Sequence, residues 1–125
     1  METKPKLLIV EDDDLNQLIY NKIFANKYDI LMCKNEDDFY PALKKNKIDI
    51  FLIDISLVGT KDGIQLIQEL RQMKEYESTP IIVVTANAFK KDEEIAKDAG
   101  ATKFIRKPVD TKFLIEEFEN SLTLQ

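Results

Sequence analysis

The sequence of 125 residues contains no histidine, and this absence excludes several kinds of site at once. Zinc sites built on histidine and Ser-His-Asp catalysis both require an imidazole. A phosphohistidine cannot form on this chain either, so any such group must belong to another protein or domain. The single cysteine, Cys33, excludes an internal disulfide bond and fits a reducing cytoplasm, where we expect the protein to reside.

Long apolar runs and an excess of basic residues are also missing. No run approaches the ~20 apolar residues of a membrane span, and the first residues, METKPK, do not resemble a signal peptide. The formal net charge is −5, whereas nucleic-acid-binding domains usually carry a basic stripe. We therefore expect neither a membrane nor a nucleic acid as a partner.

Short apolar runs recur along the chain and are mostly continuous and β-branched rather than alternating. This pattern is typical of strands that are covered on both faces. The runs are Lys6–Val10, Asp29–Cys33, Asp49–Ile53, Pro80–Val84 and Lys103–Ile105.

Segments with helical spacing separate these runs and follow the last one. The second of them, about Asp37 to Lys45, contains Pro41, which a helix tolerates best near its start. Gly100 is a typical helix C-terminal stop. The apolar residues that line one face of the other four predicted helices are Leu15, Leu18, Ile19, Ile23, Ile64, Ile67, Leu70, Ile95, Ala99, Phe113, Leu114 and Phe118.

The alternation of strand and helix predicts an α/β fold, in which a doubly wound parallel sheet carries helices on both faces. The length suits one domain with one hydrophobic core, so we expect a single domain over residues 1–125 with its core at about 6–122. In such sheets, sites form outside the carboxyl ends of the strands.

Chemically active side chains stand at four of these strand ends. Glu11 and Asp12 follow the first strand, Asp54 ends the third, Thr85 follows the fourth and Lys107 follows the fifth. An aspartate that closes a buried apolar run is unfavourable unless it has partners.

Each of these residues also has a simpler interpretation as a cap, a core residue or a solvated charge. We accept that interpretation for Asp13 and Asp14, whose carboxylates suit the start of the first helix.

The combination predicts phosphoryl transfer assisted by a metal ion. Clustered carboxylates suit Mg²⁺, which binds through one or two carboxylates, waters and phosphate oxygens. Asp54 could then accept a phosphoryl group as an aspartyl phosphate. Lys107 would neutralise charge on the transferring group, and Thr85 could donate a hydrogen bond to one of its oxygens.

The sequence resembles the response-regulator receiver domains of two-component signalling over about Lys6 to Leu122. The matching motifs are LLIVEDD, FLIDISL, VVTANA and KFIRKPVD, in the order and at the strand ends of that chemotaxis-regulator-like family. The loop from Asp54 to the Asp62–Gly63 pair departs from the usual pattern, because it lacks a proline and looks one residue longer.

The resemblance implies a flavodoxin-like (βα)5 fold with strand order 2-1-3-4-5. It implies that Asp54 is the phosphoacceptor and takes its group from a sensor histidine kinase or a histidine phosphotransfer domain. It also implies that Glu11, Asp12, Asp54 and the backbone carbonyl of Ser56 hold Mg²⁺.

The resemblance further implies a switch made by Thr85 and Phe104, and it favours a cis peptide bond between Lys107 and Pro108. The switch would act on a downstream protein through the face of the fourth helix, the fifth strand and the fifth helix. Basic residues expected on that face are Lys90, Lys91, Lys103 and Arg106.

Two other functions remain open at this point. A phosphatase of the haloacid dehalogenase type also phosphorylates an aspartate after a strand, but it needs a second aspartate two residues later, where this chain has Ser56. The chain could also be an adaptor domain of the same fold that is never phosphorylated, although such domains tend to lose the acceptor, the acids or the lysine. We expect a signalling domain that catalyses only its own phosphorylation and dephosphorylation, and no other enzyme activity.

Overall fold

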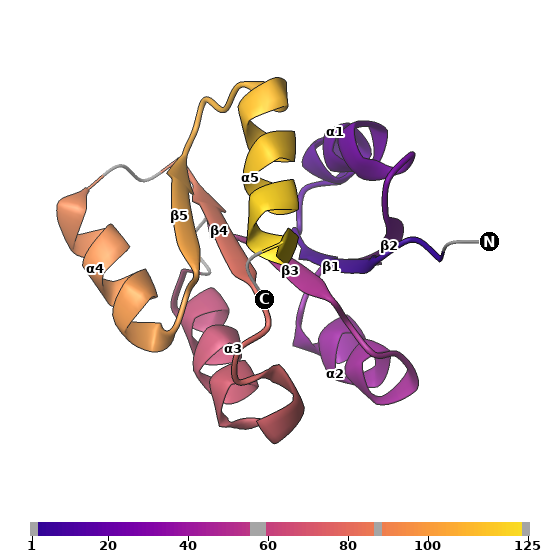
Figure 1. The fold of residues 1–125 in the computed structure, drawn as a ribbon. Helices are drawn as coiled ribbons and strands as arrows, with labels where there is room; N and C mark the ends of the chain where they lie inside the picture. Colours follow the sequence, from indigo (N-terminus) through magenta and orange to yellow (C-terminus); the bar gives the residue numbers. More distant parts are fainter. Residues whose placement is uncertain (1–2, 56–59, 87–88, 124–125) are drawn as a thin grey trace.

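The computed structural model describes residues 3–55, 60–86 and 89–123, and strands alternate with helices along them (Figure 1). The strands are β1 (Lys6–Val10), β2 (Asp29–Cys33), β3 (Ile50–Asp54), β4 (Ile81–Thr85) and β5 (Lys103–Arg106). The helices are α1 (Asp14–Phe24), α2 (Glu36–Lys45), α3 (Thr60–Gln72), the 3₁₀ turn η1 (Lys74–Tyr76), α4 (Lys90–Ala99) and α5 (Thr111–Thr123).

The five strands form one parallel sheet in the order β2-β1-β3-β4-β5, as predicted. The chain moves from β1 outward to β2 and then crosses to β3 on the other side of β1. Strand order therefore reverses between β1 and β3, and the carboxyl ends of these two strands flank the position where open α/β sheets bind ligands.

Two hydrophobic cores lie on opposite faces of the sheet, because successive side chains of a strand point to opposite faces. Helices α1 and α5 cover one face, and α2, α3 and α4 cover the other (Figure 1). In β3, Ile50 and Leu52 face α1 and α5, while Phe51 and Ile53 face the other helices. All four side chains are fully buried, as the continuous apolar runs predict.

Helix α1 buries a different face from the one its aliphatic spacing indicates. Leu15, Leu18 and Ile19 are 64%, 54% and 45% exposed, whereas Tyr20 and Phe24 are buried. The aromatic pair, four residues apart, fills the space above the sheet. Of the predicted aliphatic face, only Ile23 packs against this core. Ile95 and Phe113, at 42% and 47% exposure, are likewise outside the core of the fold.

Helix α2 forms despite Pro41, which lies well inside it rather than near its start. Asn35 caps the helix by accepting a hydrogen bond from the Asp37 backbone N–H at 2.9 Å, and Phe39 is completely buried. Capping and burial thus offset the backbone hydrogen bond that a proline removes.

Gly100 ends α4, as predicted, with a φ of +121° that residues with a Cβ rarely adopt. The Arg71 side chain packs against this turn, and a Cβ at position 100 would lie 2.5 Å from Arg71 Cγ. Arg71 donates hydrogen bonds to the carbonyl oxygens of Gly100, Tyr76 and Thr79 at 2.8, 2.7 and 2.7 Å. This side chain joins α3 to the segments that lead into β4 and β5.

Candidate functional site

Four of the predicted site residues converge at the carboxyl edge of the sheet. Asp54 and Thr85 are the last residues of β3 and β4, one residue beyond the limits expected for those strands. Glu11 directly follows β1, and Lys107 directly follows β5. Because β3 lies between β1 and β4, Asp54 occupies the middle of the group.

Asp54 is a buried carboxylate with two donors on the same oxygen. Its side chain is 1% exposed, and Oδ2 lies 2.7 Å from the Lys107 ammonium nitrogen. The Tyr20 hydroxyl donates a hydrogen bond to the same Oδ2, also at 2.7 Å. A carboxylate at this depth keeps its charge only with such partners.

Backbone geometry at the end of β5 directs Lys107 toward Asp54. The Lys107 backbone N–H donates to the Thr85 carbonyl oxygen at 2.8 Å, which continues the β4–β5 pairing by one residue. The peptide bond from Lys107 to Pro108 is cis, as the family resemblance predicts. The Lys107 side chain is 25% exposed, so one side of it remains accessible to solvent while it contacts Asp54.

Glu11 is buried, at 2% exposure, beside Asp54. Its Oε2 accepts a hydrogen bond from the Asp13 backbone N–H at 2.9 Å. Its Oε1 is buried and has no hydrogen-bond partner among the residues that the structure describes. Burial, and then the nearby Asp54, raises the pKa of Glu11 to about 8, because a second negative charge is unfavourable there.

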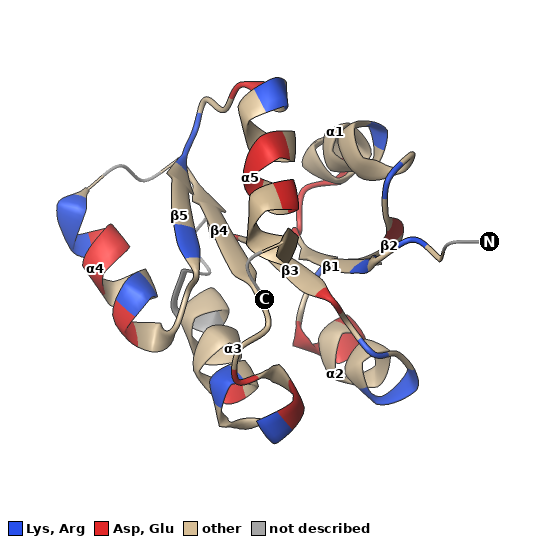
Figure 2. Ribbon diagram, in the orientation of Figure 1, with Lys and Arg blue, Asp and Glu red and all other residues tan. Residues whose placement is uncertain are grey.

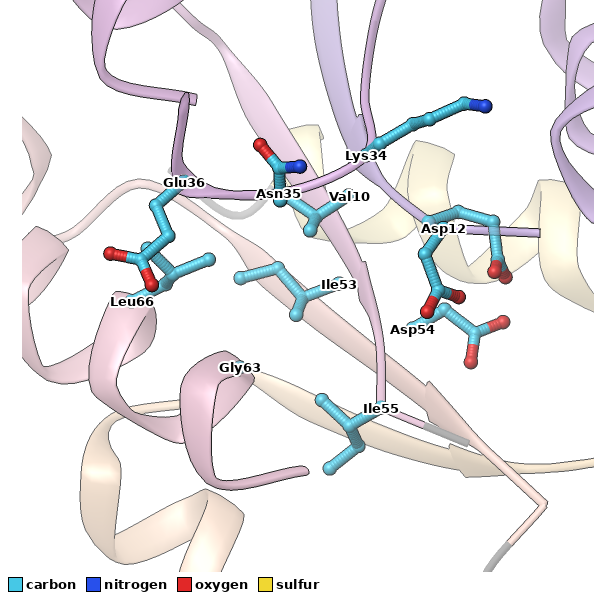
Figure 3. Close-up of a pocket in the computed structure, with 11 residues that line it drawn as sticks. Val10, Asp12, Lys34, Asn35, Glu36, Ile53, Asp54, Ile55, Gly63 and Leu66 are labelled. Carbon is cyan, nitrogen blue, oxygen red and sulfur yellow. The ribbon is translucent and has the colours of Figure 1, made fainter. Parts of the chain in front are cut away.

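Asp12 and Asp13 have the different environments that the sequence predicts. Asp13 caps α1, since its Oδ2 accepts a hydrogen bond from the Asn16 backbone N–H at 2.9 Å. Asp12 lines a pocket of about 360 Å³ together with Glu11 and Asp54. Figure 3 shows Asp12 and Asp54 at one end of this pocket, with Glu36 at the other.

This donor set fits a hard divalent cation. A cation beside Glu11 Oε1 would satisfy a buried oxygen and remove the repulsion between Glu11 and Asp54. Within residues 3–55, 60–86 and 89–123, no three histidine, cysteine, aspartate or glutamate side chains come close enough to hold an ion by themselves. Waters or phosphate oxygens would complete the coordination, as is usual for Mg²⁺.

The other predicted site residues are Thr85, Phe104 and Ser56, and their environments differ. Thr85 is completely buried, and its hydroxyl lies 3.5 Å from the carbonyl oxygen of Ile55. Phe104 is half-buried and packs at the edge of the core under α4. Ser56, whose carbonyl was predicted to bind the metal, lies outside the described residues, as does most of the loop up to Asp62.

Tyr20 is the site residue that the sequence reasoning missed. Apolar spacing in α1 assigned the inner face to its aliphatic residues, and a tyrosine gave no separate signal. The spacing of Tyr20 and Phe24 by four residues could have indicated the buried face. Burial first, and then the adjacent Asp54 charge, raises the pKa of Tyr20, so the hydroxyl remains a donor.

The face of α4, β5 and α5 is less basic than predicted. Lys103 forms an ion pair with Glu117 at 2.9 Å, and Arg106 forms one with Glu93 at 3.3 Å. Figure 2 shows acidic and basic residues interspersed along α4. A groove of about 580 Å³ between these elements is lined in part by Phe104.

Comparison with known proteins gives consistent matches over most of the chain. The model of the response regulator receiver domain matches residues 7–119. The chain is 30% identical over 122 residues to the transcriptional regulatory protein BaeR of Escherichia coli, covering 97% of this chain and 49% of BaeR. It is 29% identical over 117 residues to the polar-differentiation response regulator DivK of Brucella anthropi, covering 93% of this chain and 94% of DivK.

A solved structure with the same fold is the receiver domain of the sensor histidine kinase PA1611 from Pseudomonas aeruginosa. It matches with a TM-score of 0.84 and 24% identity, covering 97% of this chain and 99% of that domain. That structure has a magnesium ion coordinated in its active site cleft. The present chain thus spans about half the length of BaeR and nearly the whole length of DivK and of the PA1611 domain.

Proposed function

Because the chain belongs to the response regulator receiver domain family of two-component signalling, we propose that Asp54 is its phosphoacceptor. The observation that carries this proposal is the buried Asp54 carboxylate, held by Lys107 at the carboxyl end of β3. The donor would be the phosphohistidine of a sensor histidine kinase or of a histidine phosphotransfer domain, since this chain has no histidine.

In this transfer, an Asp54 oxygen attacks the phosphorus, and the bond from phosphorus to the donor nitrogen breaks. The imidazole leaves and takes up a proton from solvent. Lys107, already 2.7 Å from Asp54, is placed to balance negative charge on the transferring group. Thr85 ends the neighbouring strand, where its hydroxyl could turn toward a phosphoryl oxygen.

We assign Mg²⁺ to Glu11, Asp12 and Asp54, with the Ser56 carbonyl as a fourth protein ligand that lies outside the described residues. Bound there, the ion would neutralise charge on the carboxylates and orient a phosphoryl oxygen. The buried Oε1 of Glu11, which has no hydrogen-bond partner among the described residues, supports this assignment from the chain itself. The magnesium ion in the PA1611 receiver domain supports it by family likeness.

The proposed chemistry serves signalling rather than turnover of other substrates, and on this basis we expect no enzyme activity beyond self-phosphorylation and dephosphorylation. The family match weakens the phosphatase alternative, as does Ser56 where that class needs an aspartate. The retained acceptor, acids and lysine argue against an adaptor that is never phosphorylated.

Labelling with a small phosphodonor tests this function without a cognate kinase. Acetyl phosphate with Mg²⁺ should add one phosphoryl group to the protein, because Asp54 and its partners are already assembled. Removal of Mg²⁺ with EDTA should reduce labelling severely, since two acidic side chains would then face the donor. Intact-protein mass spectrometry measures both results. Equal labelling with and without the metal would contradict the proposed role of the carboxylates.

We also propose that phosphorylation changes the face of α4, β5 and α5, through which a downstream protein is bound. Thr85 and Phe104 stand on neighbouring strands, and the register places Phe104 beside Val83, two residues before Thr85. Inward movement of the Thr85 hydroxyl would open space that the half-buried Phe104 ring could fill. The charges of this face form ion pairs, so its partner would recognise a mixed surface rather than a basic one.

Thr85→Ala is expected to separate phosphorylation from this switch. The variant should still be labelled by acetyl phosphate, since Asp54, Lys107 and the acids remain. Its Phe104 region should not respond, because the coupling hydroxyl is gone. Fluorine NMR of fluorophenylalanine-labelled protein, with and without beryllofluoride, measures the response. A Phe104 shift as large as that of the parent protein would show that the hydroxyl is not the coupling element.

The cellular location, the extent of the domain and the absence of a nucleic-acid partner are predictions. None of the helices in the described part of the chain is long and apolar enough to cross a membrane. We propose a cytoplasmic location, and a single receiver domain over residues 1–125 with its core at about 6–122. That no nucleic acid is a partner also stays a prediction, since the chain matches about half of a transcriptional regulatory protein.

A further inference from the structure

Tyr20 forms a contact with the phosphoacceptor that the proposed transfer does not use. Its hydroxyl donates to Asp54 Oδ2 at 2.7 Å, the same oxygen that receives the Lys107 ammonium group. The two donors approach from different elements, Tyr20 from α1 and Lys107 from the turn after β5. The reacting carboxylate is therefore held by one donor from a helix and one from the connection between β5 and α5.

The position of Tyr20 is fixed by packing and not only by this hydrogen bond. The residue is 6% exposed and belongs to the core that α1 and α5 form on the sheet. Its ring also lines a cavity of about 490 Å³ between these helices, together with Val84, Lys107 and Leu114. Since a buried tyrosine hydroxyl needs an acceptor, and the ring is fixed by packing, the hydroxyl is directed at Asp54.

This hydrogen bond stabilises the carboxylate in its charged form. Hydrogen bonds to an ionised acceptor are about twice as strong as those between neutral groups. Phosphorylation converts Asp54 into an acyl phosphate, and whichever oxygen forms the bond to phosphorus, the carboxylate loses its negative charge. The contact with Tyr20 must then weaken. It favours the unphosphorylated protein over the phosphorylated one.

We infer that the Tyr20 hydroxyl is a further functional group of the site, which slows phosphorylation of Asp54 and speeds hydrolysis of the aspartyl phosphate. This inference rests on the proposed function. In phosphorylation by acetyl phosphate, Asp54 forms a bond to phosphorus and acetate leaves, so a donor that stabilises the attacking oxygen lowers its nucleophilicity. In hydrolysis, water attacks phosphorus, inorganic phosphate forms and the Asp54 carboxylate leaves. The same donor stabilises that leaving group.

Tyr20→Phe tests the inference, because it keeps the ring and removes only the hydroxyl. With acetyl phosphate and Mg²⁺, the variant should be phosphorylated about three- to tenfold faster than the parent. This is less than the full contribution of a hydrogen bond to a charged group, because the attacking oxygen keeps part of its charge in the transition state. After acetyl phosphate is removed by desalting, the phosphorylated variant should lose its phosphoryl group more slowly than the parent by a similar factor. Intact-protein mass spectrometry over time gives both rates.

Tyr28→Phe is the matched control. Tyr28 is also buried, but it follows α1 at the opposite end of the sheet and packs against Phe24 and Phe118. Both of its rates should equal those of the parent. A general loss of packing would slow phosphorylation or accelerate hydrolysis, and each of these changes is the reverse of the one expected for Tyr20→Phe.

A second measurement uses the parent protein and therefore does not depend on whether a variant folds. Carbon NMR of tyrosine labelled at Cζ should show the Tyr20 signal moving when beryllofluoride and Mg²⁺ are added, while the Tyr28 signal stays in place. The inference would be overturned if the two rates for Tyr20→Phe equalled those of the parent or changed in the reverse direction. It would also be overturned if the Tyr20 signal did not move. A parent protein that is never phosphorylated would instead overturn the proposed function.

Discussion

Replacing Asp54 with asparagine is expected to abolish phosphorylation of the protein by acetyl phosphate. Asparagine keeps the size and much of the hydrogen bonding of the side chain but has no anionic oxygen to attack phosphorus. The Lys107 ammonium group, now 2.7 Å from Asp54, would lose its counter-ion. Intact-protein mass spectrometry should show a phosphorylated parent and an unmodified Asp54→Asn variant.

Glu36→Gln is the matched control for that experiment. Glu36 is another carboxylate that lines the same pocket, at the end away from Asp54 (Figure 3), and its side chain is exposed. The control removes one negative charge near the site without removing the proposed acceptor. It should be labelled like the parent. Labelling of Asp54→Asn at the parent level would assign the acceptor role to a different residue.

Asp12→Ala is expected to weaken Mg²⁺ binding about tenfold or more, since even residues that only support metal ligands change affinity by 10- to 100-fold. Asp13→Ala, at the next position, should leave Mg²⁺ affinity nearly unchanged. It should lower the free energy of unfolding by about 1 kcal/mol, because the Asn16 backbone N–H loses its cap.

Isothermal titration calorimetry with magnesium chloride compares the two variants, and urea denaturation measures the loss of the cap. The pair is informative because the residues are adjacent and carry the same charge. Mg²⁺ affinities that fall equally in both variants would mean that general negative charge, and not coordination by Asp12, sets the affinity.

The sheet was predictable because its signals are local. The central strands β1, β3 and β4 are short runs with both faces buried, whereas the edge strands β2 and β5 are partly exposed. In β1 and β2 the predicted limits, Lys6–Val10 and Asp29–Cys33, agree with the structure. Parallel pairing then brings the carboxyl ends of the strands to one edge of the sheet. The sequence alone therefore predicts that Glu11, Asp54 and Lys107 lie close together. The strand order came from the family resemblance.

Side-chain packing was less predictable, since a helix can have more than one apolar face and only the fold decides which of them packs on the sheet. In α1 the aliphatic stripe from Leu15 to Ile19 is exposed, and Tyr20 takes the inner position. The same error hid the hydrogen bond from Tyr20 to Asp54. Similarly, sequence shows the charges of Lys103 and Arg106 but not their ion pairs with Glu117 and Glu93.

The central claim is that the phosphoryl group resides on Asp54, and chemical trapping tests it at the level of the residue. Borohydride reduces an aspartyl phosphate to homoserine, whereas an unmodified aspartate does not react. Peptide mass spectrometry after acetyl phosphate, Mg²⁺ and borohydride should find homoserine at position 54 and at no other carboxylate. Homoserine can form only at an aspartate, and the account expects it at Asp54 alone. Homoserine at Asp12 or at any other aspartate would contradict the account.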